Sequence, residues 1–296
     1  MTYQNHCSIC NSKNIFKIHD TIREFKKDVL KCSTCDIVFL NNYKSINYQE
    51  DYGTRLFDDS WDIDKKIKER SKSLKEITNK IDNIIKKNNY RDILELGAGY
   101  GSTLIDLINK NKEKNFSCLE QNQDYISLIK SKTNSKVYLD LKKINKKFDI
   151  IYAIHFIEHI EKPISFLKDI KKILKRNGIL FLVTPNHDDF YMNTLPNKNL
   201  RKYKNFIYHA AHPYYYNIIS LDYVLNKSGF KSNSISTDQD YSITNFINWF
   251  SYGEPSKNIS SAKKINKKMI DLDKLFKSLL NKRNFGSNLW STSFIK

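Results

Sequence analysis

The sequence contains little arginine, few cysteines and no long apolar run, and each shortage narrows the possible classes of protein. Only seven of the 50 basic residues are arginines, and no arginine-rich run occurs. Phosphate and base recognition favours the planar fork of arginine, so the net charge of +18 fits a general lysine bias better than a nucleic-acid surface. No apolar run approaches the ~18 residues of a membrane helix, and the N-terminus lacks the apolar core of a secretory signal. We therefore expect a soluble, cytoplasmic protein without a membrane span.

Glycine is also scarce, yet three of the eight glycines fall within five residues. An apolar strand, Ile93–Leu96, leads into Gly97, Gly99 and Gly101, and a helical pattern follows over residues 102–110. A strand that breaks on glycines and restarts as a helix directs free backbone N–H groups and a positive dipole end at a ligand. The G-x-G-x-G spacing differs from the dinucleotide fingerprint G-x-G-x-x-G, although a nicotinamide fold or a tight turn without ligand also stays open.

Strand and helix patterns alternate from Ile93 onward, which predicts a doubly wound, mostly parallel α/β sheet of seven strands. The expected strands cover residues 93–96, 116–120, 137–140, 148–154, 179–183, 231–237 and 289–295, the last at an edge. The expected helices cover residues 63–85, 102–110, 122–132, 163–174 with a glycine cap at 177–178, and a segment that begins at 220.

The same patterns suggest three parts in the chain. We expect a small domain at 1–45, a connector and leading helix at 46–90, and the α/β domain at 91–296. Insertions at 187–217 and 242–285 interrupt the last of these. The second insertion is amphipathic toward its end, which fits a lid, a homo-oligomer contact or packing on the sheet.

Four of the five cysteines form two pairs with metal-ligand spacing. Cys7 and Cys10 are separated by two residues, as are Cys32 and Cys35. Two such knuckles can place four thiolates around one structural Zn²⁺, which would stabilise a segment too poor in apolar residues to fold alone. Reduced thiols or a single redox pair are the alternatives.

Acidic and polar residues at strand ends are candidates for ligand contacts. Glu95 lies inside the strand before the glycines and can hold hydroxyls or a cation. Glu120 ends the second strand, where nucleoside-binding α/β folds place an acid that accepts hydrogen bonds from ribose hydroxyls. Gln121 follows it. Asp140 could accept an adenine amino group, with the Leu141 backbone at the ring edge, although a plain loop aspartate is the alternative.

Histidines and tyrosines supply the candidates for catalysis. His155, Glu158 and His159 have helical spacing and either gather at one point, where they could bind a metal, or serve a structural role that orients the cofactor. His212, in the first insertion, titrates near neutrality and is a candidate general base. Tyr52 belongs to an aromatic connector, residues 43–62, that either covers the substrate or packs on the main domain.

The chain resembles class I S-adenosylmethionine-dependent methyltransferases that carry an N-terminal four-cysteine zinc domain, a group that includes bacterial sugar and natural-product methyltransferases. The resemblance rests on the two cysteine pairs, Glu120, LELGAGYG, FDIIYAIHFIEHIEKP, LKRNGILFLVTPN and the HPYYYN…SLDYVLNKSGF segment. It implies a Rossmann-like sheet beside a zinc-ribbon-like domain. The methionine end of the donor would lie at Gly97, Ala98 and Gly99, its ribose at Glu120, and its adenine near Asp140.

The resemblance also bears on the acceptor. In the sugar C-methyltransferases a Glu-His pair is catalytic, whereas here the residue before His212 is Ala211, which favours O-methylation of a sugar, nucleotide-sugar or other small hydroxylated metabolite. His159 is the second candidate base. An RNA-modifying methyltransferase with a zinc ribbon would explain the charge, but the Asn/Asp-Pro-Pro-aromatic motif for base amines does not occur. A non-catalytic scaffold is the remaining alternative.

Overall fold

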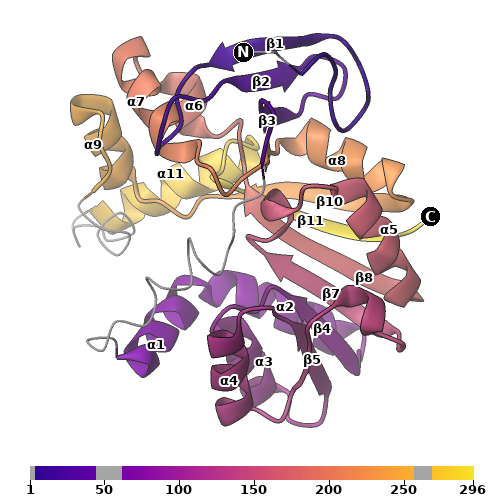
Figure 1. The fold of residues 1–296 in the computed structure, drawn as a ribbon. Helices are drawn as coiled ribbons and strands as arrows, with labels where there is room; N and C mark the ends of the chain where they lie inside the picture. Colours follow the sequence, from indigo (N-terminus) through magenta and orange to yellow (C-terminus); the bar gives the residue numbers. More distant parts are fainter. Residues whose placement is uncertain (1–3, 45–61, 257–268) are drawn as a thin grey trace.

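The structure is a computed structural model that describes residues 4–44, 62–256 and 269–296 (Figure 1). Tyr52 and most of the aromatic connector lie outside these ranges, so their expected role stays a prediction. Among the described residues, no helix combines the length and apolar character that a bilayer crossing requires.

A mixed seven-stranded sheet organises the chain, as the sequence predicted. Its order is β10-β11-β8-β7-β4-β5-β6, and the five strands from β8 to β6 are parallel. The strands are β4 (Asp92–Leu96), β5 (Asn115–Leu119), β6 (Lys136–Tyr138), β7 (Phe148–Ile154), β8 (Leu174–Pro185), β10 (Phe230–Asp238) and β11 (Asn288–Ile295). Because β4 lies beside both β5 and β7, the glycine turn that follows β4 opens at the middle of the carboxyl edge of the parallel strands.

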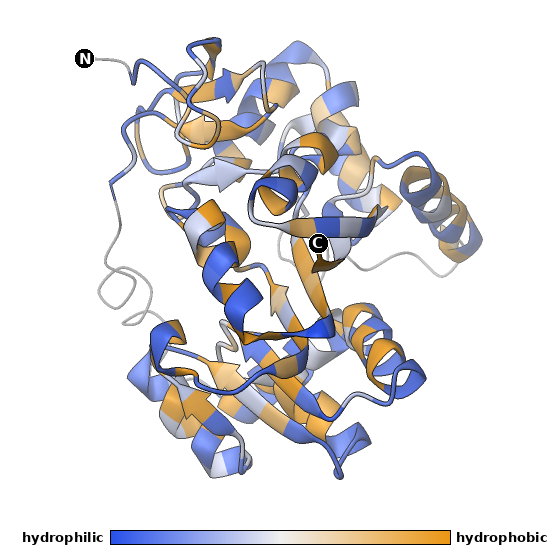
Figure 2. Cartoon of the chain, turned by 90° about the vertical axis from the view of Figure 1, so that its right-hand side faces the viewer, coloured by the Kyte–Doolittle hydropathy of each residue, from blue (hydrophilic) through white to orange (hydrophobic). Residues whose placement is uncertain are grey.

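Helices cover both faces of this sheet, because the central strands carry apolar side chains on both faces, as in β7. Ile150, Tyr152 and Ile154 enter one apolar core with α2 and α3, whereas Ile151 and Ala153 enter the other with α5 and α8. In Figure 2 the central strands are correspondingly hydrophobic. The helices are α1 (Ile63–Ser73), α2 (Lys75–Lys87), α3 (Ser102–Lys110), α4 (Gln123–Lys132), α5 (Pro163–Ile173), α6 (Phe190–Thr194), α7 (Asn197–Ile207), α8 (Ile218–Lys227), α9 (Ile243–Tyr252) and α11 (Ile270–Lys282), with short turns η2 (Leu141–Lys143) and η3 (Ile157–His159). A strand buried on both faces is typical of a central parallel strand.

Three local predictions are wrong. Strand β11 is not at the edge: it inserts antiparallel between β8 and β10, because α11 returns the chain to the gap beside β8. Helix α5 has no glycine cap, since β8 already begins at Leu174 and contains Gly178. A Cβ on Gly178 would lie 2.9 Å from the Asp149 carbonyl oxygen, so the glycine permits close strand contact. The single helix expected at 63–85 is two helices that meet at Leu74.

The N-terminal segment forms a second, smaller antiparallel sheet of β1 (Ile15–His19), β2 (Val29–Cys32) and β3 (Val38–Leu40). Its fourth strand, β9 (Tyr214–Tyr215), comes from the first insertion and pairs with Val38 and Phe39. The same insertion also contains α6 and α7, although its sequence shows no clear apolar period. The division at residues 45 and 90 stays a prediction, and the small sheet is completed by distant residues (Figure 1).

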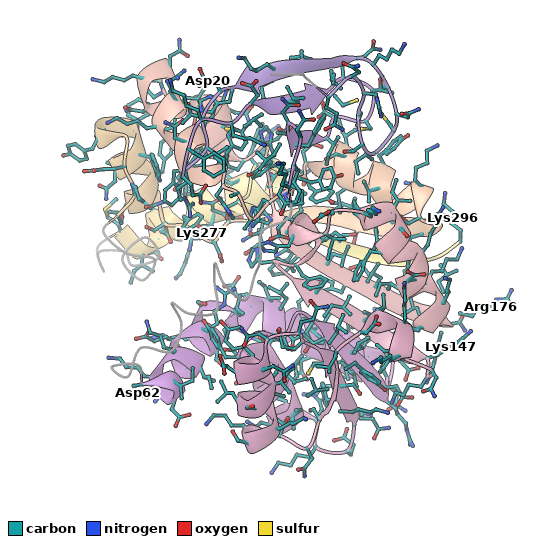
Figure 3. The ribbon with its side chains drawn as sticks, in the orientation of Figure 1. Asp20, Asp62, Lys147, Arg176, Lys277 and Lys296 are labelled. Carbon is teal, nitrogen blue, oxygen red and sulfur yellow. The ribbon has the colours of Figure 1, made fainter. Side chains whose placement is uncertain are left out.

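Basic side chains are distributed over many elements of the described structure. Lys147, Arg176 and Lys296 are exposed along the right-hand side of the molecule in Figure 3, and Lys277 lies on the left-hand side. This scatter agrees with the general lysine bias expected from the sequence.

Candidate functional site

The glycine turn after β4 has a backbone that favours glycine. Gly97, Gly99 and Gly101 have φ of +67°, +54° and +77°. A Cβ on Gly97 would lie 2.2 Å from the Phe156 ring, whereas a Cβ on Gly99 would meet nothing within 4 Å. Gly97 is therefore required by packing, and Gly99 faces open space where a ligand can approach the main chain.

A pocket of about 220 Å³ lies directly over this turn. Its wall includes four candidates from the sequence, Glu95, Gly97, Ala98 and Gly99, and also His155 from the end of β7. The remaining lining residues are Arg70, Leu74, Tyr100, Ser102, Thr103 and Ile154. The N-terminus of α3 begins beside the pocket, so backbone N–H groups and the helix dipole favour a negatively charged ligand group there.

Glu95 supplies a buried acid to the pocket. Its side chain is 4% exposed, and the Tyr152 hydroxyl donates a hydrogen bond to Glu95 Oε2 over 3.1 Å. Burial raises the pKa of Glu95 to about 8. The group is therefore protonated at neutral pH without ligand, and a bound cation would favour its ionised form.

Glu120 is held against the glycine turn from the end of β5. The Gly99 amide donates to Glu120 Oε2 over 2.8 Å, and the amides of Gln121 and Asn122 donate to Oε1. The carboxylate thus lies at the rim between β4 and β5. This position suits the predicted contact to ribose hydroxyls, which stays a prediction.

The other predicted contacts lie further along the same edge. Asp140 accepts a hydrogen bond from the Lys142 amide at the start of η2, so its carboxylate caps that turn. Leu141 packs against the core, and Gln121 is exposed. None of these three lines the pocket over the glycine turn.

A cluster of four histidines and one glutamate lies next to the pocket. His155 lines the pocket, and its Nδ1 lies 3.5 Å from Oε1 of Glu158, a residue that is 2% exposed. His159 and His212 pack edge to face with ring centroids 4.5 Å apart, and the rings of His209 and His212 are 3.8 Å apart. The structure therefore brings His212 of the first insertion against His159, and it places His155 against Glu158.

Burial sets the charge state of this cluster. Burial lowers the pKa of His209 to about 4 and that of His212 well below its ordinary value, so both rings are neutral at pH 7. Burial alone would raise the pKa of Glu158, but the adjacent His155 and His159 lower it, so the carboxylate is ionised. Neutral imidazoles beside a carboxylate can accept a proton or bind a metal ion.

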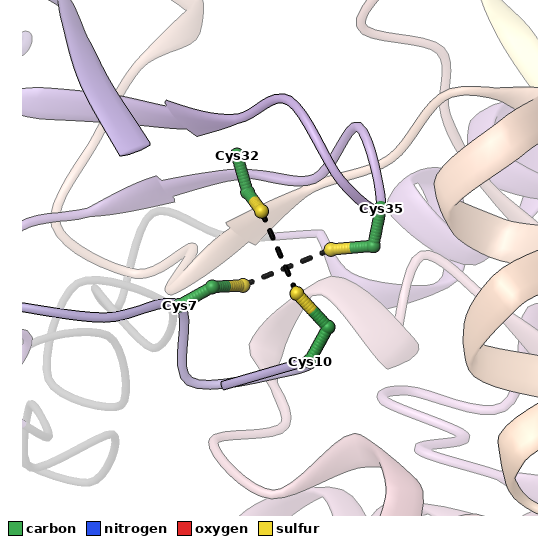
Figure 4. Close-up of side chains that lie close together, drawn as sticks. All are labelled: Cys7, Cys10, Cys32 and Cys35. Atoms are coloured by element: carbon green, nitrogen blue, oxygen red, sulfur yellow. Dashed lines mark hydrogen bonds between the residues drawn. The ribbon is translucent and has the colours of Figure 1, made fainter. Parts of the chain in front are cut away.

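The four predicted metal ligands converge at one end of the small sheet (Figure 4). Sγ of Cys7 lies 3.7 Å from Sγ of Cys35, and Sγ of Cys10 lies 3.5 Å from Sγ of Cys32. All four sulfurs lie within 4.8 Å of one another. The hydrogen bond between Cys7 and Cys35 lowers the pKa of Cys7 and raises that of Cys35. Ionisation of one thiol therefore opposes ionisation of the other, and a bound cation would favour the ionised form of both.

Sequence reasoning missed three residues around these sites. Arg70 reaches the pocket from α1, Tyr152 donates to Glu95 from within β7, and the Thr184 hydroxyl donates to Glu158 Oε2 over 2.9 Å. A single sequence gives no way to recognise one arginine on an amphipathic helix as a pocket residue. Tyr152 and Thr184 lie within apolar strands, where a polar atom does hint at a buried partner.

Comparisons with known proteins identify the fold and the reaction type. A family model described as "Methyltransferase domain" matches residues 66–234, more than half of the chain. A solved magnesium protoporphyrin IX methyltransferase from Synechocystis with bound SAH, the demethylated donor product, superposes with a TM-score of 0.50. It is 11% identical and covers 84% of this chain and 97% of its own. At this identity, the likeness shows the fold alone.

Two curated relatives match short segments. A tRNA U34 carboxymethyltransferase from Campylobacter jejuni is 39% identical over 67 residues, which is 22% of this chain and 23% of that protein. A ubiquinone biosynthesis O-methyltransferase from Pelagibacter ubique is 40% identical over 47 residues, 16% of this chain and 20% of that protein. Each match spans less than a quarter of the relative's length.

Gly99→Arg is expected to block binding of S-adenosylmethionine. The new side chain would enter the pocket, and φ of +54° adds strain, so donor affinity should fall by about two orders of magnitude or more. Isothermal titration calorimetry measures the affinity. Gly229→Ala is the control, because Gly229 has φ of +85° outside the pocket and should keep donor affinity. Unchanged affinity in Gly99→Arg would refute the pocket as the donor site.

If Glu95 contacts a cationic donor, binding should strengthen as pH rises. With a pKa near 8, Glu95 must lose its proton to attract a cation, so affinity should rise up to about tenfold per unit between about pH 5.5 and about pH 7.5. Calorimetry across this range should show a flatter profile for Glu95→Gln. Asp189→Asn, at a buried acid outside the pocket, should keep the slope. A flat parental profile would contradict the contact.

Proposed function

The chain belongs to the methyltransferase domain family and is an S-adenosylmethionine-dependent methyltransferase, and on that premise we propose that it O-methylates a sugar, a nucleotide-sugar or another small hydroxylated metabolite. The bound donor supplies an activated methyl group: its C–S bond breaks with both electrons remaining on sulfur, while a C–O bond forms to the acceptor. The protein must therefore position the two molecules and accept the hydroxyl proton.

The donor pocket fits the two ends of such a cofactor. Backbone amides at the α3 N-terminus and the Gly99 turn suit the carboxylate of its methionine part, and Glu95 suits its cationic groups. Glu120 can exchange its hydrogen bond from the Gly99 amide for bonds from ribose hydroxyls. Gly97, Ala98 and His155 line the wall of the pocket, whereas Gly101 is the N-cap residue of α3 and does not line it. Gln121, Asp140 and Leu141 lie toward the expected adenine side.

The observation that carries the proposal is the continuity between this pocket and the histidine cluster. His155 lines the pocket and lies against Glu158, and His159 Nδ1 lies 3.0 Å from the Ala211 carbonyl oxygen in the first insertion. His159 and His212 therefore lie beside the donor pocket as candidate acceptors of the hydroxyl proton. The insertion places aromatic residues around them, which suits a small hydroxylated acceptor.

We further propose that Cys7, Cys10, Cys32 and Cys35 hold a structural Zn²⁺. Four thiolates fill all tetrahedral positions, so the ion has no open position for catalysis. The module that it would stabilise supports the acceptor side. Strand β3 pairs with β9, and the Leu40 amide donates to the carbonyl of Pro213, the residue after His212.

An RNA acceptor is the second candidate. The net charge of +18 favours it, as does the segment similar to a tRNA-modifying relative. Against it, the lysines are spread along the whole sequence, and arginine is rare. A non-catalytic scaffold, the remaining alternative, would bind the donor and transfer its methyl group to no acceptor.

Incubation with isotope-labelled donor should transfer the methyl group to a saccharide or nucleotide-sugar pool and not to tRNA or rRNA. Mass spectrometry of the separated pools identifies the molecule that gains a methyl group, and Gly99→Arg is the control that should lack transfer. Methylated RNA, with binding that weakens steeply as salt rises, would establish the RNA candidate instead. Donor binding without transfer to any pool would favour the scaffold.

Cys32→Ala should abolish binding of cobalt, a probe for zinc, at the four-cysteine site. In protein reconstituted with Co²⁺, the thiolate-to-cobalt absorption band should appear in the parent and disappear in this variant, and thermal unfolding should begin at a lower temperature. Cys118→Ala is the control, because Cys118 is buried in β5 away from the other four. A full band in Cys32→Ala, or its absence from the parent, would refute the zinc site.

A further inference from the structure

We infer that Glu158, His159 and His212 form a second metal site, which binds a divalent transition-metal ion between the donor pocket and the first insertion. Each residue offers one ligand atom, and these atoms lie within 4.8 Å of one another. The site is separate from the four cysteines. Three arguments support it: the unsatisfied oxygen of Glu158, the orientation of His159, and the way in which His212 is held.

One carboxylate oxygen of Glu158 accepts a hydrogen bond, and the other is buried where a cation would stabilise it. The residue is 2% exposed, and its Oε2 accepts the hydrogen bond from the Thr184 hydroxyl. Its Oε1 is buried and accepts no hydrogen bond from the described residues, although His155 Nδ1 lies 3.5 Å away. A carboxylate oxygen that is buried without a hydrogen bond costs free energy, and coordination to a cation removes that cost.

His159 is oriented in the way that metal-binding histidines commonly are. Its Nδ1 lies 3.0 Å from the Ala211 carbonyl oxygen. Because a carbonyl only accepts hydrogen bonds, Nδ1 carries the proton, and the lone pair of the ring is on Nε2. A histidine ligand usually donates its second ring N–H to a backbone carbonyl or carboxylate, which fixes the tautomer and the ring plane.

His212 is held against His159 by its own backbone. The His212 amide donates to the His209 carbonyl oxygen, and the next residue, Pro213, accepts from Leu40 in β3. Its ring lies between those of His159 and His209, with centroid separations of 4.5 Å and 3.8 Å. The small sheet thus places one ligand, and the end of β7 places the other two.

Two imidazoles and one carboxylate suit Zn²⁺ or Fe²⁺, and three protein ligands leave a coordination position open. His155 joins this site to the donor pocket, so an acceptor hydroxyl in the open position would lie near the donor. A divalent ion acts as a Lewis acid and favours transfer of the proton from such a hydroxyl to solvent water, after which the oxygen can take the methyl group. This step rests on the proposed function, and in it His159 and His212 act as ligands and not as bases.

Cobalt stoichiometry tests the site without measuring methyl transfer, so its outcome is independent of the proposed function. The full chain is reconstituted with Co²⁺ and dialysed. Total cobalt comes from elemental analysis, and the thiolate-to-cobalt absorption band counts the ion at the four cysteines. We expect the parent to hold about one further cobalt ion per chain beyond the thiolate-bound one.

Glu158→Gln and His212→Gln should each lose the further ion and keep the thiolate band, which also reports that the small sheet is folded. Glutamine at 158 can still accept the Thr184 hydrogen bond, so it removes the charge with little change of shape. His19→Gln is the control: His19 bonds to Asn205 outside the cluster, and the variant should keep both ions.

Two results would overturn the site: no cobalt beyond the thiolate-bound ion in the parent, or an extra ion that persists in both variants. If Glu158→Gln fails to fold, His212→Gln decides alone.

Discussion

The left-handed backbone at the end of β4 is the constraint on which the rest of this protein depends. Gly97 turns the chain under the Phe156 ring, and Gly99 presents its amide to Glu120 of the next strand. A side chain at either position would distort the turn or occupy the pocket. Because the turn opens between β5 and β7, His155 after β7 lines the pocket over the turn, and Glu120 after β5 lies at the rim between β4 and β5.

Glu158 lies between the pocket over the glycine turn and the histidines next to it. Its carboxylate is buried between His155, which lines the donor pocket, and Thr184, which ends the neighbouring strand β8. The adjacent His159 binds the backbone of the first insertion. A buried charge in such a position needs several partners, and those partners come from three separate parts of the chain. The cluster therefore links the end of β7, strand β8 and the first insertion through polar contacts.

The N-terminal cysteine module is integrated into the fold by strand pairing. Strand β9 completes the small sheet, and Asn217, which follows it, donates hydrogen bonds to Asp36 of the module and to Asp188 of the insertion. The module consequently supports the segment that carries His212. Strand pairing and these hydrogen bonds therefore fix the position of the module relative to the first insertion.

The sequence by itself determined the parallel strands, the glycine turn and the cysteine pairs, because each depends on local periodicity or spacing. Phe148–Ile154 is an example: apart from Asp149 the run is apolar, which is typical of a central parallel strand buried on both faces. Only the tertiary structure decided the place of β11, the pairing of β3 with β9, and the approach of His212 to His159. These features depend on contacts between residues far apart in the chain, and the local spacing of residues in one sequence does not predict such contacts. The buried polar partners of Glu95 and Glu158 belong to the same class, since burial that raises or lowers a pKa exists only after folding.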